Sequence, residues 1–107
     1  MVKTYLKQGD LAPYLIIDTN ADVTGASSLV AKVRRFHTDT VAEYDLTATD
    51  VEAGILEYQW VDGDTDVPGT YEVEAVVTFA GGAIETFPQR SDLELILLPK
   101  VIPPPPP

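Results

Sequence analysis

The sequence LEYQWVDGDTDVPGTYEVEAVVTFAGGAIETFP, residues 56–88, decides the fold. Apolar and polar residues alternate up to Trp60 and again from Tyr71 onward, which is the period of a half-buried β-strand. An acidic turn separates the two alternating segments, and the Gly-Gly pair at residues 81–82 is typical of a tight hairpin turn. The stretch therefore predicts antiparallel strands joined by short turns.

The same alternation continues on both sides of this stretch. Strands are predicted at residues 2–6, 11–18, 29–36, 41–46, 55–61, 70–79, 83–87 and 92–98. Residues 47–53 are polar and acidic and are predicted to form a loop. Short strands separated by turns favour two antiparallel sheets packed face to face. We therefore predict an all-β fold, an immunoglobulin-like antiparallel β-sandwich of about seven to eight strands.

Trp60 is predicted to be a structural residue of the core. In the strand predicted at 55–61, Leu56, Tyr58 and Trp60 fall on one face because alternate residues of a strand point to the same side. The strand predicted at 70–79 has a similar inward face, made of Tyr71, Val73, Ala75, Val77 and Phe79.

The composition narrows the classes of partner. The chain has 107 residues, enough for one domain, which we place at residues 1–102. It has no cysteine, and its formal net charge is -10 at pH 7. A surface with this excess of negative charge repels phosphate backbones and anionic lipids, so we expect neither nucleic acid nor membrane as a partner. The sequence has no apolar run of 18 residues and no secretory signal pattern.

The acidic turn offers a possible cation site. Asp62, Asp64 and Asp66 stand at alternate positions and could supply oxygen ligands to calcium. The pattern departs from a calcium-binding helix-loop-helix loop, because Val67 stands where glycine is needed and Val73 where glutamate is needed. The alternative is an acidic turn whose aspartates cap nearby backbone N–H groups. We favour that turn and expect no cofactor.

The segment from Asp66 through Gly69 to Tyr71 resembles a tyrosine corner. In that motif a tyrosine near the start of a strand turns its hydroxyl back onto the upstream backbone. The alternative is a core tyrosine that follows a Pro-Gly turn. Gly69 and Tyr71 are predicted to be structural in either case.

Lys32, Arg34 and Arg35 form the only basic cluster. They could receive an acidic partner or the acidic face of a second copy. They could equally pair across strands with Glu43 or Asp45. The only histidine, His37, lies in a polar turn without a nucleophile pattern, and we expect no catalytic activity.

The sequence ends in a run of five prolines, which we treat as a tail at residues 103–107. Such a run favours the stiff, extended polyproline II conformation. It is either a spacer or a docking peptide for an aromatic groove on a partner. The candidate partner-binding residues of the tail are Pro103, Pro104, Pro105, Pro106 and Pro107.

Residues 9–101 resemble the immunoglobulin-like amino-terminal domain of the phage baseplate upper protein family, which also occurs as a small stand-alone phage structural protein. The matching segments are GD at 9–10 before the strand with Pro13, VTGA at 23–26, GILEYQW at 54–60, DTDVPGTY at 64–71 and ETFP at 85–88. The resemblance implies a structural role, and the family brings no enzymatic residues to this sequence.

We therefore expect a non-enzymatic phage virion module that docks on tail, baseplate, neck or capsid proteins. Its expected partners are other virion proteins in a symmetric, multi-copy assembly, and its expected location is the virion, after synthesis in the bacterial host cytoplasm. The alternative is a module that binds carbohydrate or the host surface, for which an exposed aromatic would be the indicator. The candidate aromatics, most of which we expect in the core, are Tyr5, Tyr14, Phe36 and Tyr44.

Overall fold

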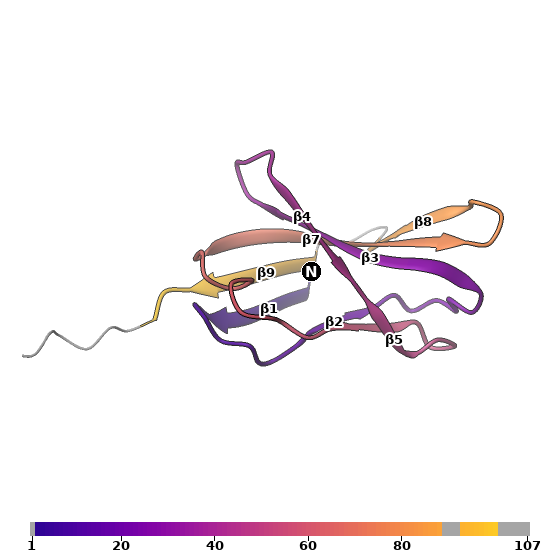
Figure 1. Ribbon diagram of the computed structural model, residues 1–107, viewed down its shortest axis with the longest axis horizontal. Helices are drawn as coiled ribbons and strands as arrows, with labels where there is room; N and C mark the ends of the chain where they lie inside the picture. Colours follow the sequence, from indigo (N-terminus) through magenta and orange to yellow (C-terminus); the bar gives the residue numbers. More distant parts are fainter. Residues whose placement is uncertain (1, 89–92, 101–107) are drawn as a thin grey trace, which may run out of the picture.

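The computed structural model describes residues 2–88 and 93–100, and these residues form an all-β domain (Figure 1). The described residues contain nine strands, which are β1 (Val2–Lys7), β2 (Leu15–Asp18), β3 (Ala26–Arg35), β4 (Val41–Asp45), β5 (Thr47–Asp50), β6 (Ile55–Tyr58), β7 (Gly69–Phe79), β8 (Ile84–Phe87) and β9 (Leu93–Leu98). None of the residues described belongs to a helix that could cross a membrane.

The strands form two sheets that pack as a sandwich. The larger sheet has six strands in the order β1-β9-β7-β3-β4, with β8 also paired to β7. The smaller sheet has the order β2-β6-β5 and lies below the larger one in Figure 1. The prediction of an all-β sandwich is confirmed.

The long strand β7 is the centre of the larger sheet. One of its edges pairs with β3 along most of its length. Its other edge pairs with β9 at residues 69–72 and with β8 at residues 75–78. The predicted hairpin at residues 81–82 is confirmed, because the Phe79 N–H donates to the Ala83 carbonyl at 2.8 Å across that turn.

One hydrophobic core fills the space between the sheets. The alternation predicted for residues 70–79 is confirmed, since Val73, Ala75 and Val77 are buried and Tyr71 and Phe79 pack against the core. The core also contains residues from β1, β2, β3, β6, β8 and β9, so both ends of the described chain share it.

The chain changes sheets at Leu46, and there the sequence prediction was wrong. Residues 47–53 were expected to be a loop, but Thr47–Asp50 form β5 and pair with β6. Leu46 is buried, and its N–H donates to the Leu29 carbonyl at 2.8 Å. This contact holds the chain between β4 and β5, while β-branched Thr47 and Thr49 suit an extended backbone.

Three other predicted strands have a boundary that moves by three or more residues. The strand predicted at 11–18 begins only at Leu15, because Pro13 cannot donate to a ladder. The strand predicted at 29–36 instead spans Ala26–Arg35, with a register shift between Ala26 and Ser28. The strand predicted at 55–61 ends at Tyr58, so Trp60 lies just beyond β6.

The expectation of purely antiparallel sheets was also wrong. Strands β1 and β9 pair in parallel, from Val2 opposite Leu93 to Lys7 opposite Leu98. The register places Lys3 opposite Glu94, and their side chains form an ion pair at 3.9 Å. The predicted strand residue 92 and the tail at 103–107 lie outside the described residues.

Candidate functional site

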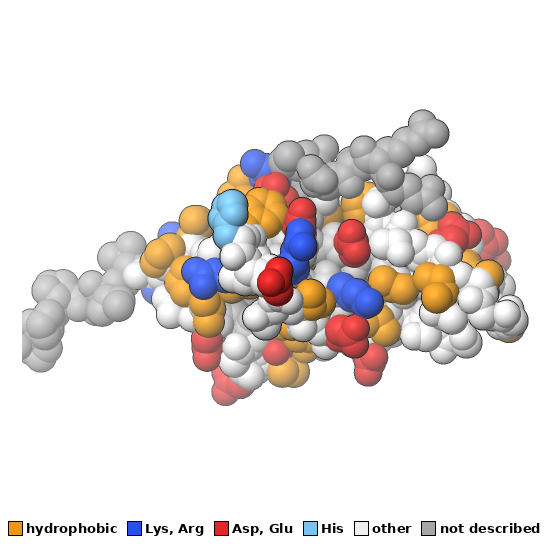
Figure 2. Space-filling model, turned by 90° about the horizontal axis from the view of Figure 1, so that it is seen from above, with side chains coloured by type: hydrophobic (Ala, Val, Ile, Leu, Met, Phe, Trp, Pro, Cys, Tyr) orange, Lys and Arg blue, Asp and Glu red, His pale blue; other side chains and the backbone are white. Residues whose placement is uncertain are grey.

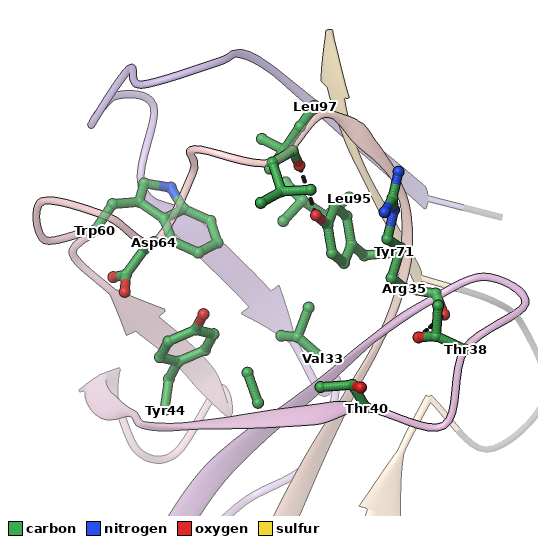
Figure 3. A pocket seen from close by; sticks show the side chains of 12 residues that line it. Val33, Arg35, Thr38, Thr40, Tyr44, Trp60, Asp64, Tyr71, Leu95 and Leu97 are labelled. Carbon is green, nitrogen blue, oxygen red and sulfur yellow. Dashed lines mark hydrogen bonds between the residues drawn. The ribbon is translucent and has the colours of Figure 1, made fainter.

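The domain has a pocket of about 290 Å³, and Figure 3 shows the side chains that line it. Its walls come from the turn between β3 and β4 (residues 36–40) and from the loop between β6 and β7 (residues 59–68). Side chains from β3, β4, β7 and β9 complete the lining. We call this feature the aromatic pocket, because Tyr44, Trp60 and Tyr71 line it.

The floor of the aromatic pocket is part of the inner face of the larger sheet. Val33, Leu95 and Leu97 are buried core residues that also line the pocket. The smaller sheet reaches only to Tyr58 on β6, and the loop at residues 59–68 continues over this end of the larger sheet. The pocket therefore lies where irregular chain replaces sheet-on-sheet packing.

Tyr44 and Trp60 form one wall, and both rings pack against Tyr58, which does not itself line the pocket. Tyr44 stacks on Tyr58 with ring centroids 4.6 Å apart, and Trp60 meets Tyr58 edge-on at 5.4 Å. Trp60 is buried, as predicted, and its indole Nε1–H donates to the Pro13 carbonyl at 2.9 Å. Such ring pairs add to the stabilisation from burial alone, so this wall is fixed by contacts within the domain.

The opposite wall contains the tyrosine corner, which is confirmed. The Tyr71 hydroxyl donates to the Val67 carbonyl at 2.5 Å, four residues upstream. Gly69 has a φ of +153°, and a Cβ there would lie 2.7 Å from Nε of Arg35. The Arg35 guanidinium donates to the Pro68 carbonyl at 3.0 Å, so arginine and tyrosine both hold this segment.

Replacing Tyr71 with phenylalanine is expected to lower the free energy of unfolding by about 1–2 kcal/mol. The change removes the hydroxyl and leaves the Val67 carbonyl without that donor, while the ring can stay in place. Chemical denaturation of the variant and the wild-type chain measures the difference. A variant as stable as wild type would contradict a structural role for this hydrogen bond.

Asp64 connects the acidic turn to the aromatic wall. Its Oδ2 accepts hydrogen bonds from the Tyr58 hydroxyl at 2.6 Å and from the Val61 N–H at 2.9 Å. Asp62 and Asp66 are exposed. Within residues 2–88 and 93–100, no group of three histidine, cysteine or acidic side chains is placed to share a metal ion. Asp64 thus makes the backbone cap expected of an acidic turn.

The pKa values of Tyr44 and Tyr71, which line the pocket, and of the neighbouring Tyr58 are raised. Desolvation raises the pKa of Tyr58 well above its usual range, and the hydrogen bond to Asp64 and the charge of that carboxylate add to the effect. Burial also raises the pKa of Tyr44 and of Tyr71, and nearby Arg35 partly offsets the shift at Tyr71. The three hydroxyls therefore resist ionisation in the folded state.

This shift predicts a loss of stability at alkaline pH. A tyrosine with a raised folded pKa supports the fold fully below its unfolded pKa of about 10, and that support declines as pH rises through the folded value. Tyr58→Phe should flatten the decline above about pH 10, because phenylalanine cannot ionise. Denaturation midpoints measured from neutral to alkaline pH compare the two chains. Identical slopes would contradict the account of Tyr58.

The predicted basic cluster is paired largely within its own sheet. Lys32 forms an ion pair with Glu43 at 3.7 Å, which is one of the cross-strand pairs expected. Arg34 pairs with Glu72 on β7, and Arg35 turns to the Pro68 carbonyl at the pocket. Figure 2 shows basic and acidic side chains interspersed on the face seen from above. Lys32 and Arg34 thus have acidic neighbours already.

Two aromatics are more exposed than expected. Tyr5 is 54% exposed and Tyr14 is 43% exposed, so the expectation that most of the four candidates lie in the core was wrong for this pair. On β1 the side chain of Leu6 is buried, whereas that of its neighbour Tyr5 points to the opposite, exposed face. Phe36 and Tyr44 are half-buried.

The aromatic pocket itself was not predicted. The sequence analysis identified Trp60, Gly69 and Tyr71 as structural residues, and the structure brings Trp60 and Tyr71 to one pocket. The sequence analysis did not link these residues to Tyr44, which is distant in sequence, or to Val67, which lies in a loop. The alternation in residues 41–46 could have placed Tyr44 on an inward face.

No family model matches this sequence, and no curated protein matches it. The resemblance to the phage baseplate domain stays a prediction.

Proposed function

We propose that this chain is a non-enzymatic structural module of a phage virion, with an immunoglobulin-like fold, that docks on neighbouring virion proteins. Those neighbours are tail, baseplate, neck or capsid proteins in a symmetric, multi-copy assembly. The observation that carries the docking part of the proposal is the aromatic pocket, an apolar concavity with tyrosine and tryptophan in its walls. The virion part rests on the sequence resemblance at residues 9–101.

The lining suits protein recognition for physical reasons. Tyrosine and tryptophan supply large contact areas with few rotatable bonds, and such residues dominate the centres of protein interfaces. The floor of Val33, Leu95 and Leu97 is apolar, whereas Arg35 and Asp64 provide polar groups at the walls. An apolar centre with a few polar groups is the usual composition of a specific docking pocket.

Sheet edges offer a second mode of contact. Within the described chain, β4 pairs only with β3 and leaves its other edge open, and Val41 on that strand is 47% exposed. An extended segment of a partner could add to such an edge through backbone hydrogen bonds. The edge lies beside the pocket, since Ala42 and Tyr44 of β4 line it.

Mass spectrometry of purified phage particles tests the virion assignment. The protein should be present in particles at a fixed ratio to other structural proteins, and it should remain after washing at high salt. Abundant host cytoplasmic proteins serve as the contamination control. Absence from particles, or a level no higher than those host proteins, would exclude the virion role.

Binding to carbohydrate or to the host surface is a second candidate, because Tyr5 and Tyr14 are exposed. An exposed aromatic ring can stack on the apolar face of a sugar. A glycan array tests this with the wild-type chain and with Tyr14→Ala. Binding that the substitution abolishes would favour the second candidate, and no signal above background would remove it.

A further inference from the structure

We propose that the aromatic pocket receives the proline run, residues 103–107, of a second copy of this chain. This inference rests on the proposed docking function and names the segment that is docked. The proposed function does not connect the aromatic pocket with the proline run. This inference connects them, because the pocket is open and the run consists of prolines without ionisable side chains.

The chemistry of the pocket matches that of a proline run. Proline has no N–H, so a run of prolines offers apolar rings and carbonyl acceptors only. Aromatic grooves with hydrogen-bond donors are the usual receptors for such segments. Tyr44 and Thr40 both line the pocket, and neither hydroxyl donates a hydrogen bond to another residue in the described part of the chain. They are therefore available to proline carbonyls.

The pocket wall already makes one contact of this kind. The Trp60 indole donates to the carbonyl of Pro13 at 2.9 Å. The pocket volume of about 290 Å³ lies at the lower end of the range for ligand pockets. Five prolines in polyproline II extend over roughly 15 Å. The pocket can thus take part of the run, and the remainder can lie along its rim.

The path of the chain after β9 favours a second copy over the same domain. The Leu98 carbonyl accepts from the Gln8 N–H at 2.8 Å, and Lys100 forms an ion pair with Asp10 at 2.8 Å. These contacts hold the chain on the loop that follows β1. Only two residues separate Lys100 from the first proline. Because a proline run is stiff, a segment that begins so close to this anchor has little freedom to fold back onto its own domain.

The charge of the chain gives the contact a characteristic salt dependence. Each copy carries a formal net charge of -10, so two copies repel each other. The docked segment has no ionisable side chain, so its proline rings form no ion pair with the pocket. Salt screens the repulsion, with a Debye length of about 8 Å at physiological ionic strength. Self-association should therefore strengthen as salt is added, whereas an interface made of ion pairs would weaken.

The experiment is sedimentation of the full chain over a range of concentrations, with two matched variants. Val67 lines the pocket and is 52% exposed, whereas Val61 lies in the same loop, is 57% exposed and does not line the pocket. Val67→Lys places a charge in the pocket, and Val61→Lys adds the same charge outside it. We expect self-association of wild type and of Val61→Lys, and about a tenfold or larger rise in the dissociation constant for Val67→Lys.

A peptide of sequence KVIPPPPP, residues 100–107, provides the second measurement. It should compete with self-association of the full chain and change the fluorescence of Trp60, the only tryptophan. The peptide KVIAAAAA is the control and should do neither. Equal self-association of the two lysine variants, or no competition by the proline peptide, would overturn the proposal. A chain that is monomeric at all concentrations, even if it binds the peptide, would overturn the second-copy assignment.

Deleting residues 103–107 should abolish self-association and leave the melting temperature within about one or two degrees of wild type, because the deletion lies beyond the last strand. A collapsed melt would show that the run packs on its own domain and would also overturn the proposal. These outcomes do not depend on particle composition. If the protein is found in particles but does not bind the peptide, the proposed function stands and the proline-docking proposal is overturned.

Discussion

Trp60→Ala is expected to lower the free energy of unfolding by about 3–5 kcal/mol, the usual cost of truncating a buried tryptophan. Trp60 is 4% exposed, and its ring packs edge-on against Tyr58 and Tyr44. Removing the indole leaves a void in the core beside the aromatic pocket and leaves the Pro13 carbonyl without its donor. Since small domains have only about 5–15 kcal/mol of stability, this loss threatens folding at physiological temperature.

Trp60→Phe is the matched control. Phenylalanine keeps an aromatic ring in the wall but lacks the Nε1–H that donates to Pro13. It should lose less stability than the alanine variant and so separate packing from hydrogen bonding. Circular dichroism follows unfolding in all three chains, because tryptophan fluorescence is absent from the variants. An unchanged melting temperature for Trp60→Ala would show an exposed tryptophan and suggest a binding role instead.

Gly54→Ala is expected to destabilise the domain about as much as Trp60→Ala does. It should lower the free energy of unfolding by about 3 kcal/mol or more. Gly54 ends the turn between β5 and β6 with a φ of +74°, which L-residues rarely adopt. A Cβ at this position would lie 2.0 Å from the Ala21 carbonyl oxygen and 2.1 Å from Oγ1 of Thr19. The Thr19 hydroxyl donates to the Gly54 carbonyl at 2.9 Å and is held in place, so neither neighbour can move cheaply.

Gly63→Ala provides the control for this effect. Gly63 also has a positive φ, of +95°, but a Cβ there would meet no atom within 4 Å. Gly63→Ala should therefore lower the free energy of unfolding by only about 1 kcal/mol, which is the cost of holding alanine at a positive φ. Thermal melts of the two variants compare a crowded with an open glycine. Equal losses would mean that the contact between Gly54, Thr19 and Ala21 does not govern stability.

The strands with strong local patterns could be predicted from sequence. The alternation around Trp60 and in the strand that contains Tyr71 placed the correct residues in the core, because burial of one face imposes a period of two. Strand β5 was missed because three of its four residues are polar and its pairing with β6 stabilises them. The parallel pairing of β1 with β9 was missed because it joins opposite ends of the sequence and leaves no local signal.

The candidate site was predictable only in part. The turn, glycine and tyrosine of the segment 66–71 indicated the tyrosine corner, since that motif depends on neighbours in sequence. The aromatic pocket depends on where β6 ends and on how the loop at 59–68 lies over β9. The hydrogen bond between Asp64 and the Tyr58 hydroxyl on β6 was likewise not predicted from the alternating aspartates. Such features follow from the packing of the two sheets.

A cryo-electron microscopy map of the intact phage particle tests the central claim most directly. The account predicts density for this two-sheet sandwich in multiple, symmetry-related copies. It also predicts that the aromatic pocket, between residues 36–40 and 59–68, is covered by an extended segment of a neighbouring chain. A particle without this density, or with the pocket open to solvent in every copy, would contradict the claim that the chain is a virion module docked through this pocket.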